Sequence, residues 1–250
     1  MKKTHSGHID YSNPWYSGSQ EAWLEAGPAR HHHKKRVEYL VSAIRRLGFA
    51  KPKILDAGCG DGAMTKYLVG IPGASVTGVD YNPKRIKRAK KLVPKASFRT
   101  GNLYHLPFKN NSFDIVLIHH VLEHVKEDER VLRELHRVAK PNGILIVGVP
   151  NEGEFIAQIR DKVVQRKILD ATDHENFYTI TSLSGKVGKS GFEVIETKGI
   201  GGVVIPHHGA HMLLIQVKVF YELLHTLAQV FPAFSDSLFV IARKKPSKRS

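Results

Sequence analysis

The chain has 250 residues and a formal net charge of +15, with 42% hydrophobic and 24% charged residues. This composition is ordinary for a globular domain with one sizeable core. A single cysteine argues against a disulfide framework, the N-terminus lacks the apolar run of a signal peptide, and no stretch approaches 18 apolar residues. We therefore expect a cytoplasmic protein without a transmembrane segment.

The positive charge favours anionic partners such as nucleic acid, a lipid surface or an acidic metabolite. The basic residues are spread over three segments, at 31–36, 83–91 and 242–249. The second segment is typical of the solvated face of a helix, and the third of a polar tail. A soluble basic surface is therefore the simplest interpretation. The first segment contains three histidines and is expected at a helix N-terminus or in a lid.

Short apolar runs alternate with helical patterns along most of the chain. Apolar residues at helical spacing predict a helix over 37–47, and further helices are expected at 62–69, from Asn82 as N-cap with Pro83 first, and at 127–139. Strands are predicted at 52–58, 74–80, 96–101, 113–120, 144–150, 192–200 and 237–245. This alternation predicts a doubly wound α/β fold with a mostly parallel sheet and helices on both faces.

The segment ILDAGCGDGA at 54–63 is typical of a strand, a tight turn and a helix start. Its glycines allow close approach of a ligand, and Asp80 ends the next strand, where a carboxylate grips the ribose hydroxyls of an adenosine. The pattern also fits an NAD-dependent dehydrogenase. Against that alternative, Asp56 would repel a pyrophosphate but suits a ligand ammonium group, and no Tyr is followed four residues later by Lys.

Four ordered segments carry a more specific signal: ILDAGCGDG, VTGVDYNP, GNLYHLPFKNNSFDIVLIHHVLEHV and LRELHRVAKPNGILIVGVP. Together they resemble the motifs of class I S-adenosylmethionine (SAM) dependent methyltransferases, closest to the ubiquinone and menaquinone biosynthesis branch, over about residues 36–200. The resemblance implies a Rossmann-like sheet of seven strands with the last strand antiparallel. It also implies an N-terminal lid at 1–35 and a methyltransferase domain at 36–250 with cap insertions at about 151–180 and 199–237.

The resemblance assigns cofactor-binding roles residue by residue. The positions that would line the methionine half of SAM are Asp56, Gly58, Cys59 and Gly60. Asp80 would bind the ribose hydroxyls, with Tyr81 beside the adenine, and Asn102 and Leu103 would flank that ring. The family usually has Asp where this chain has Asn102, although Asn can still accept and donate hydrogen bonds. His119 would present its backbone carbonyl to the methionine ammonium.

Arg36, followed by Tyr39, resembles an Arg-x-x-Tyr of the quinone branch in which the Arg meets the SAM carboxylate. An exposed helix arginine is the open alternative. The segment PNG at 141–143 stands where the family has Pro-Gly-Gly, and Asn tolerates the positive φ that the turn needs.

Methyl transfer from SAM is an in-line displacement, so a general base is needed only for an acceptor such as a phenol, an alcohol or a protonated amine. The candidate bases are His120, His174 and the group His207, His208 and His211. For each of these histidines, the alternative is a surface or core residue that forms ordinary hydrogen bonds and has no role in catalysis.

No metal ligands are assigned. The segment HHGAH at 207–211 has no nearby cysteine or carboxylate. His120, Glu123 and His124 match the H-x-x-E-H of a zinc peptidase, but the first His is expected at a strand end. Glu123 and His124 are therefore interpreted as architectural.

The acceptor is the least determined feature. The helical segment within 199–237 is apolar around much of its circumference, which favours a helix packed on the sheet and leaves open a pocket for a lipidic, aromatic or isoprenoid acceptor. We expect a small-molecule acceptor that is quinone-like, a lipid or a secondary metabolite. The alternatives are an RNA methyltransferase using the basic surface and a non-catalytic SAM-binding protein, and peripheral membrane contact stays open.

Overall fold

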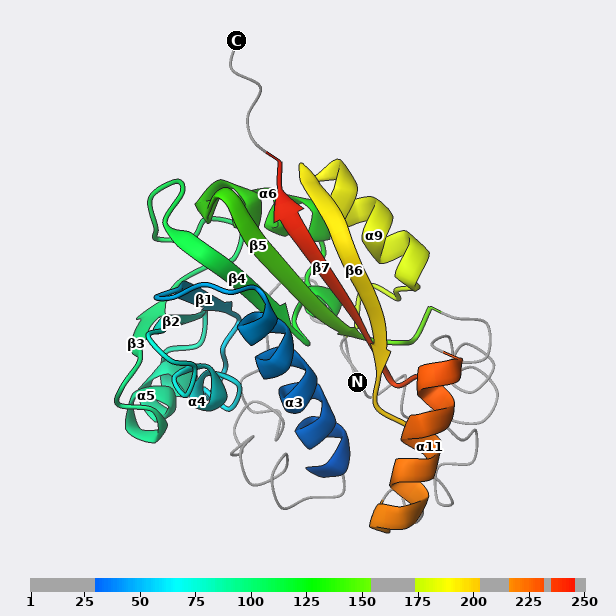
Figure 1. The fold of residues 1–250 in the computed structure, drawn as a ribbon. Helices are drawn as coiled ribbons and strands as arrows, with labels where there is room; N and C mark the ends of the chain where they lie inside the picture. The colour runs from blue at the N-terminus through cyan, green and yellow to red at the C-terminus, as the bar shows by residue number, and fades with distance from the viewer. Residues whose placement is uncertain (1–29, 154–173, 203–215, 232–234, 246–250) are drawn as a thin grey trace, which may run out of the picture.

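The computed structural model describes residues 30–153, 174–202, 216–231 and 235–245 (Figure 1). Its sheet contains β1 (Lys53–Ala57), β2 (Ser75–Asp80), β3 (Ser97–Thr100), β4 (Phe113–His119), β5 (Ala139–Pro150), β6 (Phe192–Ile200) and β7 (Ser237–Lys244). The described helices are α3 (Arg30–Arg46), α4 (Thr65–Leu68), α5 (Pro83–Leu92), α6 (Asp128–Val138), α9 (Ile180–Lys189) and α11 (Lys218–Val230), with a 3₁₀ turn, η1, at Leu122–His124.

The seven strands lie in the order β3-β2-β1-β4-β5-β7-β6. The pairs β1–β2, β2–β3, β1–β4 and β4–β5 are parallel, whereas β7 is antiparallel to both β5 and β6. The predicted Rossmann-like sheet with an antiparallel last strand is confirmed. The strand order reverses beside β1, so the loops after β1 and β4 lie at the switch point where open α/β sheets bind ligands.

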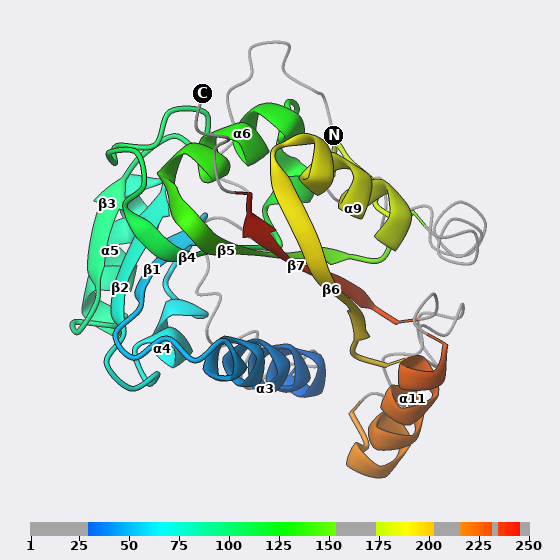
Figure 2. The ribbon, with the colours of Figure 1, turned by 45° about the horizontal axis from the view of Figure 1, so that its top comes forward.

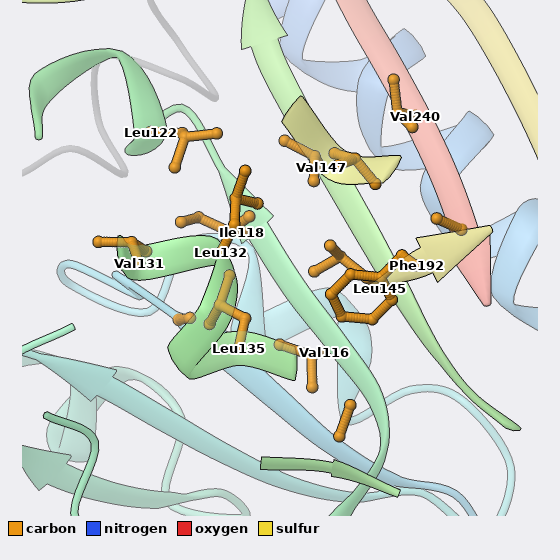
Figure 3. Close-up of a cluster of buried hydrophobic side chains, with 14 of the residues drawn as sticks. Val116, Ile118, Leu122, Val131, Leu132, Leu135, Leu145, Val147, Phe192 and Val240 are labelled. Carbon is orange, nitrogen blue, oxygen red and sulfur yellow. The ribbon is translucent and has the colours of Figure 1, made fainter. Parts of the chain in front are cut away.

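Helices cover both faces of the sheet (Figure 2). Strand β4 shows why, because successive side chains point to opposite faces. Ile115 and Leu117 pack in the cluster formed with α3 and α4, while Val116 and Ile118 pack in the cluster formed with α6 and α9. Figure 3 shows the second cluster, where Leu132 and other α6 side chains meet β4 and β5. Since the middle of β4 is buried on both faces, its residues 115–118 form an unbroken apolar run.

Three local predictions can be compared directly with the structure. The side chain of Asn82 caps α5 by accepting from the backbone amides of Lys84 at 2.9 Å and Arg85 at 3.4 Å, as predicted. Asn142 takes a φ of 60°, so the predicted left-handed conformation is present, although this residue lies within β5, where the pairing of β4 with β5 shifts register. The first described helix, α3, begins at Arg30, seven residues before the predicted start, because the polar residues of its first turns hide the apolar periodicity.

The prediction for α11 needs correction. A helix packed on the sheet was expected, but α11 lies beyond the end of β6 and the start of β7, away from both faces (Figures 1 and 2). Tyr221 and Ala228 are buried, whereas Val219, Phe220 and Leu223 are at least 49% exposed. Apolar content therefore predicted the helix but not its packing. Among the described helices, none has both the length and the apolar character needed to cross a membrane.

Candidate functional site at the carboxyl edge of the sheet

The glycine loop that follows β1 turns sharply and is fixed against β2. Gly58 has a φ of 79° and Gly60 a φ of 54°, a region that favours glycine. The backbone amides of Gly58 and Cys59 donate to the carbonyl of Val79 at 2.7 and 3.0 Å. A Cβ on Gly58 would lie 2.5 Å from Cγ2 of Val121, so the loop also packs closely on the segment after β4.

Asp80 joins the end of β2 to this loop. Its Oδ2 accepts from the Gly60 amide at 3.0 Å and its Oδ1 accepts from the Asn82 amide at 2.8 Å. Burial raises the pKa of Asp80, and the two backbone hydrogen bonds oppose that rise. A carboxylate can accept about four hydrogen bonds, so this oriented group can also accept from a ligand.

Asp56 lies in β1, beside the same loop. Its side chain is buried, and the hydroxyl of Thr65 donates a 2.6 Å hydrogen bond to its Oδ2. The pKa of Asp56 is raised to about 6, mainly because burial disfavours the charged form. The Thr65 hydrogen bond opposes this rise, and the nearby Asp80 carboxylate adds to it. A cationic ligand group beside Asp56 would favour its charged form.

The other residues expected to contact SAM differ in how exposed they are and in what their side chains contact. Tyr81 follows Asp80 directly and is partly exposed. Asn102 is exposed, and its Oδ1 accepts from the amide of Tyr104 at 2.9 Å, so this side chain shapes its own turn. Leu103 packs against the core under α6. Cys59, in contrast, packs its side chain in a buried cluster with Ala89 and Phe98, so only its backbone faces the loop.

His119 and His120 end β4 and begin the next turn. The ring of His119 stacks on Phe239 with ring centroids 5.6 Å apart, while the amide of His120 donates to the carbonyl of Gly148 at 2.8 Å. His120 has a φ of 52°, which is unusual for a residue with a side chain and turns the chain away from the strand. Loss of solvent lowers the pKa of both rings well below the usual range.

Arg36 reaches the same edge of the sheet from α3. Its Nη2 lies 3.2 Å from Oδ2 of Asp236, and the side chain is only 15% exposed. Nδ1 of His32 contacts the same carboxylate oxygen. Although burial opposes ionisation, His32 and Arg36 hold the pKa of Asp236 below its ordinary value. The alternative of an exposed helix arginine is wrong.

A second polar cluster surrounds Glu123 in η1. The Glu123 side chain is 1% exposed, and its Oε1 lies 3.5 Å from Nδ1 of His120 and 3.8 Å from Nε2 of His124. The rings of His124 and His174 meet edge to face with centroids 4.7 Å apart. Nδ1 of His174 forms a 2.6 Å hydrogen bond with Oε2 of Glu152. Two of the predicted bases, His120 and His174, are therefore brought together beside Glu123.

Backbone hydrogen bonds hold the segment that carries His174. The carbonyl of Glu123 accepts from the amides of Glu175 at 2.7 Å and Asn176 at 3.1 Å. The side-chain amide of Asn176 also donates to the carbonyl of Val125 at 2.6 Å. His174 is thus attached to the turn after β4 although it lies about fifty residues further along the chain.

Sequence reasoning missed Asp236 and Glu152 and gave Glu123 and His124 no role in the chemistry. The H-x-x-E-H spacing was a signal for the latter pair, but nothing in the sequence connects Asp236 with Arg36. His207, His208 and His211 lie outside the described residues. An open groove of about 750 Å³ between α3 and the α4 region, lined by Val41, Arg45, Tyr67 and their neighbours, contains none of the predicted site residues.

Comparison with known proteins identifies relatives of this chain. Residues 55–147 match the model of a methyltransferase domain family. The ubiquinone biosynthesis O-methyltransferase of Azorhizobium caulinodans is 31% identical over 193 residues, covering 74% of this chain and 73% of that protein. The 2-methyl-6-phytyl-1,4-hydroquinone methyltransferase of Synechocystis is 32% identical over 144 residues, covering 55% of this chain. The match spans only 45% of the Synechocystis protein, and several other curated relatives are also matched over less than two thirds of their length.

Solved structures agree on the fold. A SAM-dependent methyltransferase from Methanosarcina mazei superposes with a TM-score of 0.60 at 20% identity, covering 82% of this chain and 98% of that chain. At this level of identity the likeness concerns the fold alone.

Proposed function

Because this chain belongs to the class I SAM-dependent methyltransferases, we propose that it transfers a methyl group from SAM to a small-molecule acceptor that is quinone-like, a lipid or a secondary metabolite. The observation that carries the proposal is the Asp80 carboxylate, which is bound to the glycine loop and stands at the same sheet edge as the polar clusters after β4. The names of the Azorhizobium and Synechocystis relatives support a quinone-type acceptor.

The donor groups of the site fit SAM by their chemistry. Asp80 offers oriented acceptors to the two ribose hydroxyls, and buried Asp56 offers a negative charge to the methionine ammonium. Arg36 reaches the same edge and offers a guanidinium to the methionine carboxylate, in competition with Asp236. We assign Gly58, Cys59 and Gly60 to the methionine half through their backbone, and Tyr81, Asn102 and Leu103 to the adenine end.

When bound, SAM supplies an electrophilic methyl group, so the chain itself has to align the acceptor and exclude water. His119, at the end of β4, offers its backbone carbonyl to the methionine ammonium. His120 and His174 are the two candidate bases beside the acceptor, and one of them takes the single proton that is released where the acceptor is a hydroxyl. The lid at 1–35 and the cap insertions at about 151–180 and 199–237 enclose the acceptor in this proposal.

Calorimetry with SAM, S-adenosylhomocysteine and NAD tests the cofactor. We expect binding of the first two and none of NAD, and tight NAD binding without SAM binding would overturn the proposal. Transfer of label from methyl-labelled SAM to a panel of hydroquinones, lipids and small phenols then tests the acceptor. Label transfer to RNA alone would replace the proposal with an RNA methyltransferase, and binding without transfer to any substrate would favour a non-catalytic protein.

A further inference from the structure

The cluster after β4 has the donor set of a metal centre. Glu123, His124 and His174 each offer one ligand atom, and these three atoms lie within 4.8 Å of one another. Two of the donors come from η1, and the third comes from the segment that the Glu123 carbonyl holds through two backbone hydrogen bonds. The set therefore belongs to a folded part of the molecule and does not depend on long, mobile surface side chains.

The Glu123 carboxylate supplies an independent indication that this cluster binds a cation. Its side chain is 1% exposed, and Oε2 is buried without a hydrogen-bond partner among the described residues. An unpaired buried carboxylate oxygen is costly, since it has lost its hydration without compensation. A divalent ion beside Glu123 would supply that compensation.

Glu152 adds the feature that accompanies metal-binding histidines. The 2.6 Å contact between its Oε2 and Nδ1 of His174 places the proton on Nδ1, because a carboxylate accepts. Nε2 of His174 is then the nitrogen with a free electron pair for a cation. Such carboxylate–histidine pairs fix the ring orientation and raise the basicity of the ligand nitrogen.

We propose that Glu123, His124 and His174 bind a divalent first-row transition ion such as Zn²⁺ or Co²⁺, with Glu152 as the positioning residue for His174. Two imidazoles and one carboxylate suit these ions better than Mg²⁺ or Ca²⁺, which prefer oxygen ligands. Three protein ligands leave at least one coordination position open. The open position takes water or an oxygen atom of the methyl acceptor, and this last role rests on the proposed function. With the ion bound, both ring nitrogens of His174 are engaged, so His120 is the base that remains for the acceptor proton.

This centre differs from the peptidase pattern considered for the sequence. In that pattern His120 and His124 would be ligands on one long helix, but η1 is a single 3₁₀ turn and His120 precedes it with a φ of 52°. The third ligand comes instead from His174, far along the chain. The same Glu123 and His124 thus serve a different ligand set.

The test uses the full chain, stripped with a chelator and titrated with Co²⁺ or Zn²⁺ alone. We expect elemental analysis to give about one ion per chain. We also expect a visible absorption band typical of Co²⁺ with a low coordination number. Glu123→Gln and His174→Ala should each weaken Co²⁺ binding at least tenfold, and Glu152→Gln about 10–100-fold. Circular dichroism checks that each variant is folded, and Glu123→Gln keeps the shape of the side chain.

Two controls make the result decisive. His105→Ala removes a histidine that contacts Arg130, outside the cluster, and should leave Co²⁺ binding unchanged. The triple variant His207→Ala, His208→Ala and His211→Ala should also retain it. Unchanged binding in Glu123→Gln and His174→Ala, or loss in the triple variant, would overturn the proposal. SAM calorimetry on the stripped protein tests the methyltransferase assignment separately, since the metal ligands lie outside the assigned SAM contacts.

Discussion

The Arg36 guanidinium lies 3.2 Å from the Asp236 carboxylate and joins the first described helix to the residue before β7, two hundred positions away. Removing one partner of a buried ion pair leaves the other charge poorly compensated, although in Arg36→Met His32 would still contact the Asp236 carboxylate oxygen. Arg36→Met should therefore lower the free energy of unfolding by about 3 kcal/mol, measured by urea denaturation.

A matched control exists on the same helix. Arg46 pairs with Glu196 at 3.1 Å, but its side chain is 53% exposed, so Arg46→Met should cost less than about 1 kcal/mol. Equal losses in the two variants would show that burial of the Arg36 pair is not what matters.

Asp80 is predicted to bind the ribose of SAM. Replacing it with Ala removes a charged acceptor, and SAM affinity measured by calorimetry should fall by about 1–3 kcal/mol. Asp114→Asn is the control, because Asp114 pairs with Lys140 near the opposite edge of the sheet and should leave SAM binding unchanged. An Asp80→Ala protein that is folded and binds SAM with unchanged affinity would remove Asp80 from the site.

Asp56 predicts a pH dependence of SAM binding. Its pKa in the folded protein is about 6, and the methionine ammonium favours the charged carboxylate, so affinity should fall as pH drops below 6, at most tenfold per unit. Calorimetry from pH 5 to 8 measures the profile. Asp56→Asn should flatten it, and an unchanged slope in that variant would assign the titration to another group.

The raised pKa of Asp56 also predicts how the stability of the folded protein changes with pH. Since the folded pKa of Asp56 is raised above its ordinary 3.8, its contribution to stability is fully present below pH 3.8 and is lost as pH rises through about 6. Asp56→Asn cannot ionise but can still accept from Thr65, so it should gain stability relative to wild type over this interval, by at most about 3 kcal/mol. Urea denaturation at pH 4 and pH 7 compares the two proteins.

Gly58 is predicted to tolerate no side chain. In Gly58→Ala the Cβ would meet Val121 at 2.5 Å and the backbone would keep a φ of 79°, which costs a residue with a side chain about 1–2 kcal/mol. Thermal unfolding should show destabilisation, and Val121→Ala in the same chain should restore only the steric part. Full restoration in the double variant would mean that the positive φ costs nothing.

Much of the fold was predictable because its signals are local. The buried strands are short apolar runs, Asn82 and Pro83 mark the start of α5, and Asn142 was recognised as a position that needs positive φ. The start of α3 was missed because His32 and His33 are polar in the sequence but buried in the structure. The position of α11 was missed because apolar content does not say which neighbour a helix packs against.

The sequence by itself determined the sheet, the glycine loop and the carboxylate at the end of β2, since each depends on residues close together in the chain and on the regular periods of strands and helices. Only the tertiary structure decided the partners at the far end of the site. Arg36 meets Asp236, and His174 meets Glu123, through contacts between elements distant in the chain. No periodicity or spacing encodes such contacts, because they arise when the sheet order places the ends of distant strands at one edge.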